Sequence, residues 1–378
     1  MQLAFYISGH GFGHASRQIA IVNALHRRRP DISFLLRTEV PRRLLDRTLT
    51  PPFDLDAGPC DTGIVQIDAL RLDARATIAK ARDFYGRGFD ARVDAEADRL
   101  RAHGIRLVIA DAPPLACAAA ARVGIPAIVV ANFTWDWIYE DYREHLGSAP
   151  DLLPTIREAY AGAREAWRLP MHGGFETFDR IRDTPFVARH ARHARGETRG
   201  RLELPMDARL VLCSFGGYDV EGIDFAALDT RGDWHVVSTT NDSSAASVGR
   251  VLTVHESRIY DEALRYEDLV CACDVVVSKP GYGIISECIA NGTALVYTDR
   301  DRFAEYPVLV SEMPNFVRCA YLDQASLRAG RWQSALDAAV GAPRPSERPA
   351  TDGADVIADM MSALCSHDAA FFGLPPQL

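Results

Sequence analysis

The stretch that decides the fold lies near the N-terminus, where residues 3–17 read Leu-Ala-Phe-Tyr-Ile-Ser-Gly-His-Gly-Phe-Gly-His-Ala-Ser-Arg. Its first part, Leu3–Ser8, is apolar and is typical of a buried β-strand. A loop with three glycines at alternate positions follows, and Ala15–Arg28 then carries the apolar stripe of an amphipathic helix. A strand, a tight glycine turn and a helix form the first unit of an α/β fold with a parallel sheet.

The same alternation of strands and helices continues along most of the chain. The expected strands are Leu3–Ser8, Ile32–Arg37, Leu107–Ala110, Ala127–Ala131, Arg209–Ser214, Trp234–Ser238, Val251–Val254, Asp274–Ser278 and Leu295–Thr298. The pattern predicts helices at Leu115–Val123, where Gly124 fits the C-cap, and at Ile284–Ala290. Residues 132–179 interrupt the alternation and are rich in aromatic side chains, so we expect irregular helices there.

A segment rich in Arg, His and Gly, residues 187–207, separates the two alternating regions. We interpret it as a solvated linker with a helical piece, the alternative being a phosphate-binding patch. The chain then divides into domains at 1–187 and 188–378, with a cleft between them. An amphipathic helix at Val356–Leu364 can pack back on the first domain. Open α/β sheets bind ligands at the carboxyl ends of their strands, so the loops there matter most.

Composition excludes several classes of protein. The chain has 378 residues, 48% of them hydrophobic, which fits a soluble globular protein of about two domains. Its net charge of −9 argues against broad binding to nucleic acid or anionic membranes. No apolar run approaches the ~20 residues of a membrane span. Residues 1–7 lack the basic start and the small-residue cleavage site of a signal peptide, so we expect a first β-strand there. Eight cysteines without a CxxC pair indicate reduced thiols in a cytoplasmic protein and no zinc site. The oligomeric state cannot be predicted.

Two histidines, His10 and His14, stand in the first loop. His14 occupies a position where the GxGxxG dinucleotide pattern would continue, which disfavours a nicotinamide enzyme. Imidazole is well matched to proton abstraction near neutral pH, so either residue could act as a base in the cleft. The alternative is that His14 caps the helix and His10 packs in the core.

Asp111 directly follows the strand Leu107–Ala110. It would lie beside His14 if this strand and the first strand are neighbours. A carboxylate there could hold the imidazole tautomer and stabilise the imidazolium, as in a Ser-His-Asp triad whose nucleophile comes from the substrate. The alternative is that Asp111 is the N-cap of the following helix.

These motifs together resemble those of the GT-B glycosyltransferases. The resemblance is carried by Gly11-Phe12-Gly13-His14, Val108–Asp111, Val123–Pro126, Lys279-Pro280-Gly281-Tyr282-Gly283-Ile284-Ile285-Ser286-Glu287 and Ala290–Gly292. A narrower resemblance is to the glycosyltransferase-like N-terminal half of plant L-arabinokinases. It spans roughly residues 3–330 and rests on Gly9–Arg17, Gln66–Leu70, Asn132–Asp136 and Gly281–Gly283. The chain lacks a Walker loop and the Gly-Leu-Ser-Ser loop of galactokinase-like kinases, so we do not expect arabinokinase activity.

The resemblance implies two Rossmann-like domains, with the acceptor bound by residues 1–187 and a nucleotide sugar bound by residues 188–378. It implies an inverting, metal-independent transferase that moves a sugar to a small soluble acceptor and needs no further cofactor. His14 would be the general base and Asp111 its partner, with His10 as a second candidate base. Glu287 would bind the nucleotide ribose, the alternative being a solvated helix residue.

The implied donor contacts otherwise follow the glycine-rich loops and the strand ends. They are Gly11, Gly13, Ser214, Gly216, Gly217, Lys279, Gly281, Tyr282, Gly283, Ile284, Ile285, Arg300, Asp301 and Glu305. A plain turn is the simpler interpretation of Ser214–Gly217. The usual Asp-Gln pair is absent, which makes Asp301 and Glu305 substitute candidates for contacts to the sugar. Residues 299–301 have Asp-x-Asp spacing but fall in this sugar loop, so we predict no metal.

The implied acceptor side is aromatic and polar. Its candidates are Phe12, Asn132, Phe133, Thr134 and Trp135. Aromatic rings stack on sugar and heterocycle faces, although packing in the core is the alternative for each ring.

Two other classes of function stay open on this sequence. A sugar-nucleotide-binding module without activity is one, because the narrower resemblance is to a domain fused to a kinase; binding without turnover would identify it. An epimerase or hydrolase with the same fold is the other, and release of free sugar or its epimer without acceptor would identify it. The nucleotide base, the sugar and the acceptor are not fixed by these motifs.

Overall fold

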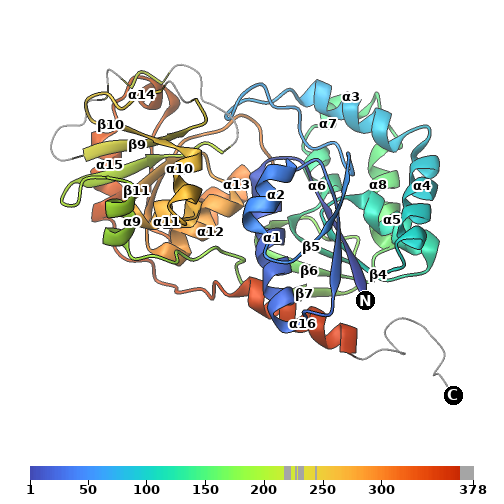
Figure 1. The fold of residues 1–378 in the computed structure, drawn as a ribbon. Helices are drawn as coiled ribbons and strands as arrows, with labels where there is room; N and C mark the ends of the chain where they lie inside the picture. Colours follow the sequence, from blue (N-terminus) through green and yellow to red (C-terminus); the bar gives the residue numbers. More distant parts are fainter. Residues whose placement is uncertain (217–222, 226–227, 229–233, 243–244, 367–378) are drawn as a thin grey trace.

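The computed structural model describes residues 1–216, 223–225, 228, 234–242 and 245–366 and contains two parallel β-sheets (Figure 1). The first sheet has the order β3-β2-β1-β4-β5-β6-β7 and the second the order β10-β9-β8-β11-β12-β13. The prediction of an α/β fold with two parallel-sheet units is therefore confirmed.

The first sheet consists of β1 (Gln2–Ile7), β2 (Ser33–Thr38), β3 (Asp54–Ala57), β4 (Ile105–Asp111), β5 (Ala127–Phe133), β6 (Glu165–Gly173) and β7 (Ile181–Asp183). The second consists of β8 (Arg209–Cys213), β9 (Trp234–Thr240), β10 (Val251–His255), β11 (Val275–Ser278), β12 (Ala294–Tyr297) and β13 (Cys319–Tyr321).

Helices cover both sheets. In the first half they are α1 (Phe12–Arg28), α2 (Arg42–Thr48), α3 (Ala74–Tyr85), α4 (Phe89–Ala102), α5 (Pro114–Val123), α6 (Trp135–Glu140), α7 (Arg143–Leu146) and α8 (Leu152–Ala161). The others are α9 (Arg195–Arg201), α10 (Glu256–Asp261), α11 (Tyr266–Ala272), α12 (Tyr282–Asn291), α13 (Tyr306–Glu312), α14 (Gln324–Arg328), α15 (Gln333–Gly341) and α16 (Gly353–Ser366).

Strand β1 shows why the first sheet is buried on both faces. Ala4 and Tyr6 enter one apolar cluster, whereas Leu3, Phe5 and Ile7 enter another. This alternation follows from the two-residue period of a strand, and near-continuous apolar strands are typical of parallel sheets between helix layers.

The last helix, α16, lies against α1 on the first sheet rather than with the second sheet that precedes it (Figure 1). Its Ile357 and Met361 are buried in the same apolar cluster as Leu25. At the rim, Nη1 of Arg28 lies 2.7 Å from Oδ1 of Asp355. The first unit thus contains segments from both ends of the described chain.

Two expectations were wrong. Residues 165–173 form β6 beside β5, not an irregular helix, because their buried and partly exposed positions alternate from Trp167 onward. The segment 187–207 is not a simple solvated linker. Arg199 is buried and donates to the carbonyl oxygens of Ala272 and Ala208, and Leu204 enters the core of the second unit.

In the described part of the chain the eight cysteines form no disulfide, and Cys213, Cys271 and Cys319 are only partly buried. Within the described part of the chain, no helix is long and apolar enough to cross a membrane.

Candidate functional site

The centre of the site is a pair formed by His14 and Asp111. Strands β1 and β4 are neighbours, with Ile7 opposite Asp111, and α1 begins five residues after β1. His14 therefore lies in the first helical turn above the end of β4. Its Nδ1 is 2.7 Å from Oδ1 of Asp111, and the two side chains are 7% and 0% exposed.

Three side chains of helix α1, His14, Arg17 and Gln18, hold the carboxylate of Asp111. Arg17 forms an ion pair with both carboxylate oxygens, and Gln18 Nε2 donates to Oδ2 at 2.8 Å. Burial acts to raise the pKa of Asp111, but the charges and hydrogen bonds of Arg17 and His14 outweigh it and lower the pKa to about 2. The ionised carboxylate can only accept, so Nδ1 of His14 carries the ring hydrogen. Nε2 then holds the lone pair, and no described residue forms a hydrogen bond with it.

Neither His14 nor Asp111 acts as a helix cap, which was the alternative interpretation of each residue. The N-cap of α5 is Pro113, with no side-chain cap, and the carboxylate of Asp111 is occupied by Arg17, Gln18 and His14 instead. The N-cap of α1 is Gly11, also without a side-chain cap.

His10 has a different environment from His14. Its Nδ1 accepts from the N–H of Ile64 at 3.3 Å, so Nε2 carries the hydrogen. Nε2 lies 3.2 Å from the amide nitrogen of Gln66, and turning that amide would present Oε1, which otherwise has no partner. Burial lowers the pKa of His10 to about 3, and the charges of His14 and nearby cations act in the same direction. His10 is thus neutral, with both ring nitrogens engaged.

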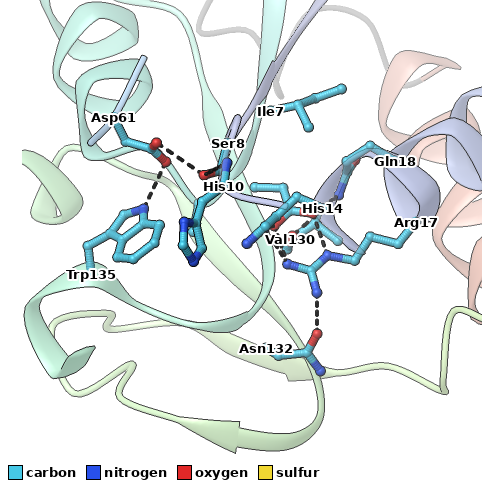
Figure 2. A network of polar contacts seen from close by, with 12 residues as sticks. Ile7, Ser8, His10, His14, Arg17, Gln18, Asp61, Val130, Asn132 and Trp135 are labelled. Carbon is cyan, nitrogen blue, oxygen red and sulfur yellow. Dashed lines mark hydrogen bonds and ion pairs between the residues drawn. The ribbon is translucent and has the colours of Figure 1, made fainter. Parts of the chain in front are cut away.

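A second buried carboxylate, Asp61, is close enough to His14 and Asp111 to feel their charges, and Figure 2 shows it bonded to Ser8 and Trp135. Its Oδ1 accepts from the hydroxyl of Ser8 at 3.1 Å and its Oδ2 from the indole N–H of Trp135 at 2.9 Å. Burial raises the pKa of Asp61 to about 6, although its hydrogen bonds and His14 act against this. Asp61 was not predicted, because its loop lies far from the histidines in the sequence.

The predicted acceptor residues differ in accessibility. Phe12 is 45% exposed, whereas Trp135 is fully buried and Phe133 is 5% exposed. The rings of Phe133 and Trp135 lie 5.4 Å and 6.5 Å from the His14 ring and form the wall that surrounds it. Asn132 accepts from Arg17, and the hydroxyl of Thr134 is buried without a partner. Residues 132–135 therefore pack as core around His14. Among the predicted acceptor residues, Phe12 is the one with a widely exposed ring.

The N-termini of two helices face each other between the two sheets. A Cβ atom at Gly283 would lie 3.7 Å from the Cα of Gly13, so the first turns of α12 and α1 are in contact. In α12 the N–H of Ile285 already bonds the carbonyl of Gly281, and the Ile285 side chain is in the core. Ile285 therefore offers neither its N–H nor its side chain at this helix end. The N–H groups of the three residues before it have no partner within the helix, and such ends favour anions.

A cluster of polar side chains follows strands β11 and β12. Arg300 Nη1 is 3.3 Å from Oε1 of Glu305, while Arg300 Nε and Glu305 Oε2 are buried without a partner. The hydroxyl of Tyr282 is also buried and without a partner. Burial lowers the pKa of Lys279 to about 7, and the charge of Arg300 adds to this effect. Unpaired buried donors and acceptors are costly, so they fit a site for a hydroxylated ligand.

Glu287 is not a solvated helix residue. It is buried, and its Oε1 accepts from Nε of Arg189 at 2.8 Å. Arg189 also lies 3.3 Å from Glu267. Burial raises the pKa of Glu287, while Arg189 acts in the opposite direction. Glu287 lines a narrow cavity between the two units, together with Arg17, Asn132 and Tyr282.

Gly13 and Gly283 also line this cavity, whereas Ser214, Gly216 and Asp301 are not among its lining residues. The hydroxyl of Ser214 is 2.6 Å from that of Tyr266, Gly216 has a φ of +75°, and Gly217 lies outside the described residues. Asp301 is exposed and is bonded to a loop of the first unit. Its N–H donates to the carbonyl of Leu70 at 2.8 Å, and its Oδ2 accepts from the N–H of Leu72 at 3.4 Å.

This contact belongs to a segment that we call the finger, Gln66–Leu72. An antiparallel bridge joins its two ends, and Asp68 accepts from the N–H groups of Leu70 and Arg71 at 2.8 Å each. Ala69 and Leu70, at its tip, are fully buried in the apolar core of the second unit. The finger therefore links the loop that holds His10 to the loop that follows β12.

Sequence reasoning missed four residues of the site. Arg17 and Gln18 follow His14 by three and four positions, so helix periodicity could have placed them on the same face. Asp61 and Arg189 are brought in by tertiary packing alone.

No protein-family model matches the chain. L-arabinokinase of Arabidopsis thaliana is 28% identical over 369 residues, which cover 95% of this chain but only 34% of that protein. The chain thus spans about a third of the length of this relative, and the predicted resemblance is confirmed at that level.

Two solved structures extend over nearly the whole chain. The calicheamicin glycosyltransferase CalG4 has a TM-score of 0.60 and 15% identity, and covers 99% of both chains. UGT2 of Phytolacca americana, complexed with UDP-2-fluoro-glucose and pterostilbene, has a TM-score of 0.58 and 12% identity, with 99% of this chain and 97% of that chain covered. At these identities the likeness concerns the architecture. The protein has the GT-B fold, two parallel-sheet units that meet at the carboxyl ends of their strands.

Proposed function

We propose that the protein is an inverting, metal-independent glycosyltransferase that moves a sugar from a nucleoside diphosphate sugar to a small soluble acceptor. The observation that carries the proposal is the His14–Asp111 pair, whose unpartnered Nε2 lies beside the facing N-termini of α1 and α12. The GT-B fold is consistent with it, as is the UDP-2-fluoro-glucose named in the complex of UGT2.

His14 would act as the general base. Its Nε2 takes the proton of an acceptor hydroxyl while that oxygen attacks the anomeric carbon from the face opposite the diphosphate. The bond between the anomeric carbon and the diphosphate oxygen breaks, and its electron pair leaves with the nucleoside diphosphate. Asp111 stabilises the imidazolium that results. His10 is neutral and hydrogen-bonded on both ring nitrogens, so we assign it to shaping the loop.

The second unit would hold the donor. The free N–H groups at Tyr282, Gly283 and Ile284, with Lys279, would stabilise charge on the leaving diphosphate. Glu287 would bind the ribose. Arg300 Nε and Glu305 Oε2, which lack partners, would bind hydroxyl groups of the sugar.

The first test is a thermal-shift screen against UDP, GDP, ADP, CDP and dTDP and their sugars, with EDTA present. Ligand at about 100 times its dissociation constant stabilises the folded state by about 2.7 kcal/mol. A single nucleotide that stabilises the protein would identify the donor base, and no shift from any of them would contradict a donor site.

The second test is turnover of His14→Ala with that donor. Loss of a general base lowers turnover by about 10²–10⁴-fold, and we expect donor binding to persist. His103→Ala, at an exposed histidine, is the matched control. Full activity of His14→Ala would contradict the assignment. Donor binding without transfer to any acceptor would favour a non-catalytic binding module, and free sugar formed without acceptor would favour a hydrolase.

A further inference from the structure

We propose that Arg17 is a positioning residue that keeps the His14 ring neutral and oriented, so that its Nε2 can accept a proton. The inference rests on the proposed function of His14, but it concerns the interaction of two side chains and can be measured without turnover.

The geometry places Arg17 at the junction of three elements. Its guanidinium contacts both carboxylate oxygens of Asp111 at the end of β4 and Oδ1 of Asn132 at the end of β5. Asn132 in turn donates to the carbonyl of Pro170 in β6 at 2.7 Å. The Arg17 side chain is only 7% exposed. Since the guanidinium of Arg17 is also fixed by Asn132, Asp111 cannot turn its Oδ1 away from His14.

The charge of Arg17 opposes protonation of the ring. Its Nη2 lies 2.8 Å from Nδ1 of His14, and a guanidinium only donates, so this approach is not a hydrogen bond when Nδ1 carries its hydrogen. A carboxylate paired with a histidine alone would stabilise the imidazolium and hold the proton on it. Here Oδ1 of Asp111, which bonds the His14 ring, also forms an ion pair with the permanently charged guanidinium of Arg17. Arg17 thus offsets the effect of Asp111 on the ring.

The charged and titratable groups around His14 come from four places. Arg17 lies on its own helix, Asp111 at the end of β4, Asp61 in the loop after β3, and His10 in the loop after β1. The two carboxylates favour the imidazolium, and His10 is neutral. Arg17 is the cation in contact with the ring, so its replacement removes the opposing charge.

The experiment compares Arg17→Gln, Arg17→Lys and the control Arg27→Gln, which lies on the exposed side of the same helix. The profile of turnover against pH is measured for each. In Arg17→Gln we expect the acidic limb of this profile to move to higher pH by about one unit. One adjacent charge shifts the pKa of a neighbouring group by about one to three units. Arg17→Lys keeps the charge but loses the fork, so it should lower kcat with a smaller displacement of the limb.

A second readout separates this inference from the proposed function. The ring C–H resonance of His14, assigned by its loss in His14→Ala, is followed by NMR as a function of pH. Its midpoint should move upward in Arg17→Gln even if no sugar transfer is ever found. A midpoint and a limb that coincide with those of Arg27→Gln would overturn the proposal. If neither Arg17 variant folds, Arg17 acts in the fold rather than on His14, and the proposal is also overturned.

Discussion

The carbonyl oxygen of Leu70 accepts a hydrogen bond from the N–H of Asp301 at 2.8 Å, which ties the tip of the finger to the loop after β12. The Leu70 side chain is fully buried among residues of the second unit. The finger thus holds together the two units that lie on either side of the candidate site.

Replacing Leu70 by Ala should weaken this contact. Truncation of a buried leucine costs about 2–5 kcal/mol, so we expect a lower free energy of unfolding in urea and a higher KM for the donor. Ile67→Ala, at a residue of the same finger that is 60% exposed, is the control. Equal stability of the two variants would show that the tip does not hold the units together.

Asp61 should make stability depend on pH with a defined sign. Its folded pKa of about 6 lies above the ordinary value of 3.8, so its contribution is present below about pH 4 and is lost as pH rises to about 6. The difference between these two pKa values corresponds to about 3 kcal/mol of the free energy of unfolding. The free energy of unfolding of Asp61→Asn, minus that of the wild type, should therefore rise between pH 4 and pH 6. The exposed substitution Asp83→Asn should show no such trend, and a constant difference for Asp61→Asn would contradict the buried environment.

Glu287→Gln should weaken nucleotide binding. Hydrogen bonds to a charged group contribute about 1.5–3 kcal/mol, so we expect a Kd about 10- to 100-fold higher by titration calorimetry. Arg189 keeps Glu267 as its partner, which limits structural damage. The control is Glu262→Gln, at an exposed position. An unchanged Kd would remove Glu287 from the donor site.

Lys279 should make diphosphate binding sensitive to pH. Its pKa of about 7 means that the cation is lost as pH rises through that value. The Kd of the nucleoside diphosphate should therefore increase between pH 6 and pH 8. In Lys279→Arg, where the charge persists, the increase should be smaller. Parallel curves for the two proteins would show that the Lys279 charge does not contact the diphosphate.

The sequence was most informative where function and local structure coincide. The apolar strand, glycine loop and helix at residues 3–28 predicted both the first unit and the place of His14. The expected neighbour relation of two strands also placed Asp111 beside it, because carboxyl ends of parallel strands share one edge. Arg17 follows His14 by three residues, so helix periodicity could have placed both on one face, but the prediction did not use this spacing.

Other features could not be predicted because they depend on packing between distant segments. Strand β6 was missed although its alternation was present, since aromatic residues and Pro170 obscured the two-residue period. Asp61, Arg189 and the tip of the finger acquire their environments only when the two units meet. Their sequence neighbourhoods resemble ordinary loops.

The position of α16 has a consequence for how the chain folds. The second unit is inserted between two segments of the first, so the side of α1 that packs on α16 is not covered until residues 353–366 arrive. On the ribosome, the unit that is begun first would be completed last, after the intervening sheet has been made. Until then Leu25 and its neighbours lack the cover of Ile357 and Met361, and the nascent chain would carry an apolar patch that invites chaperones or premature association.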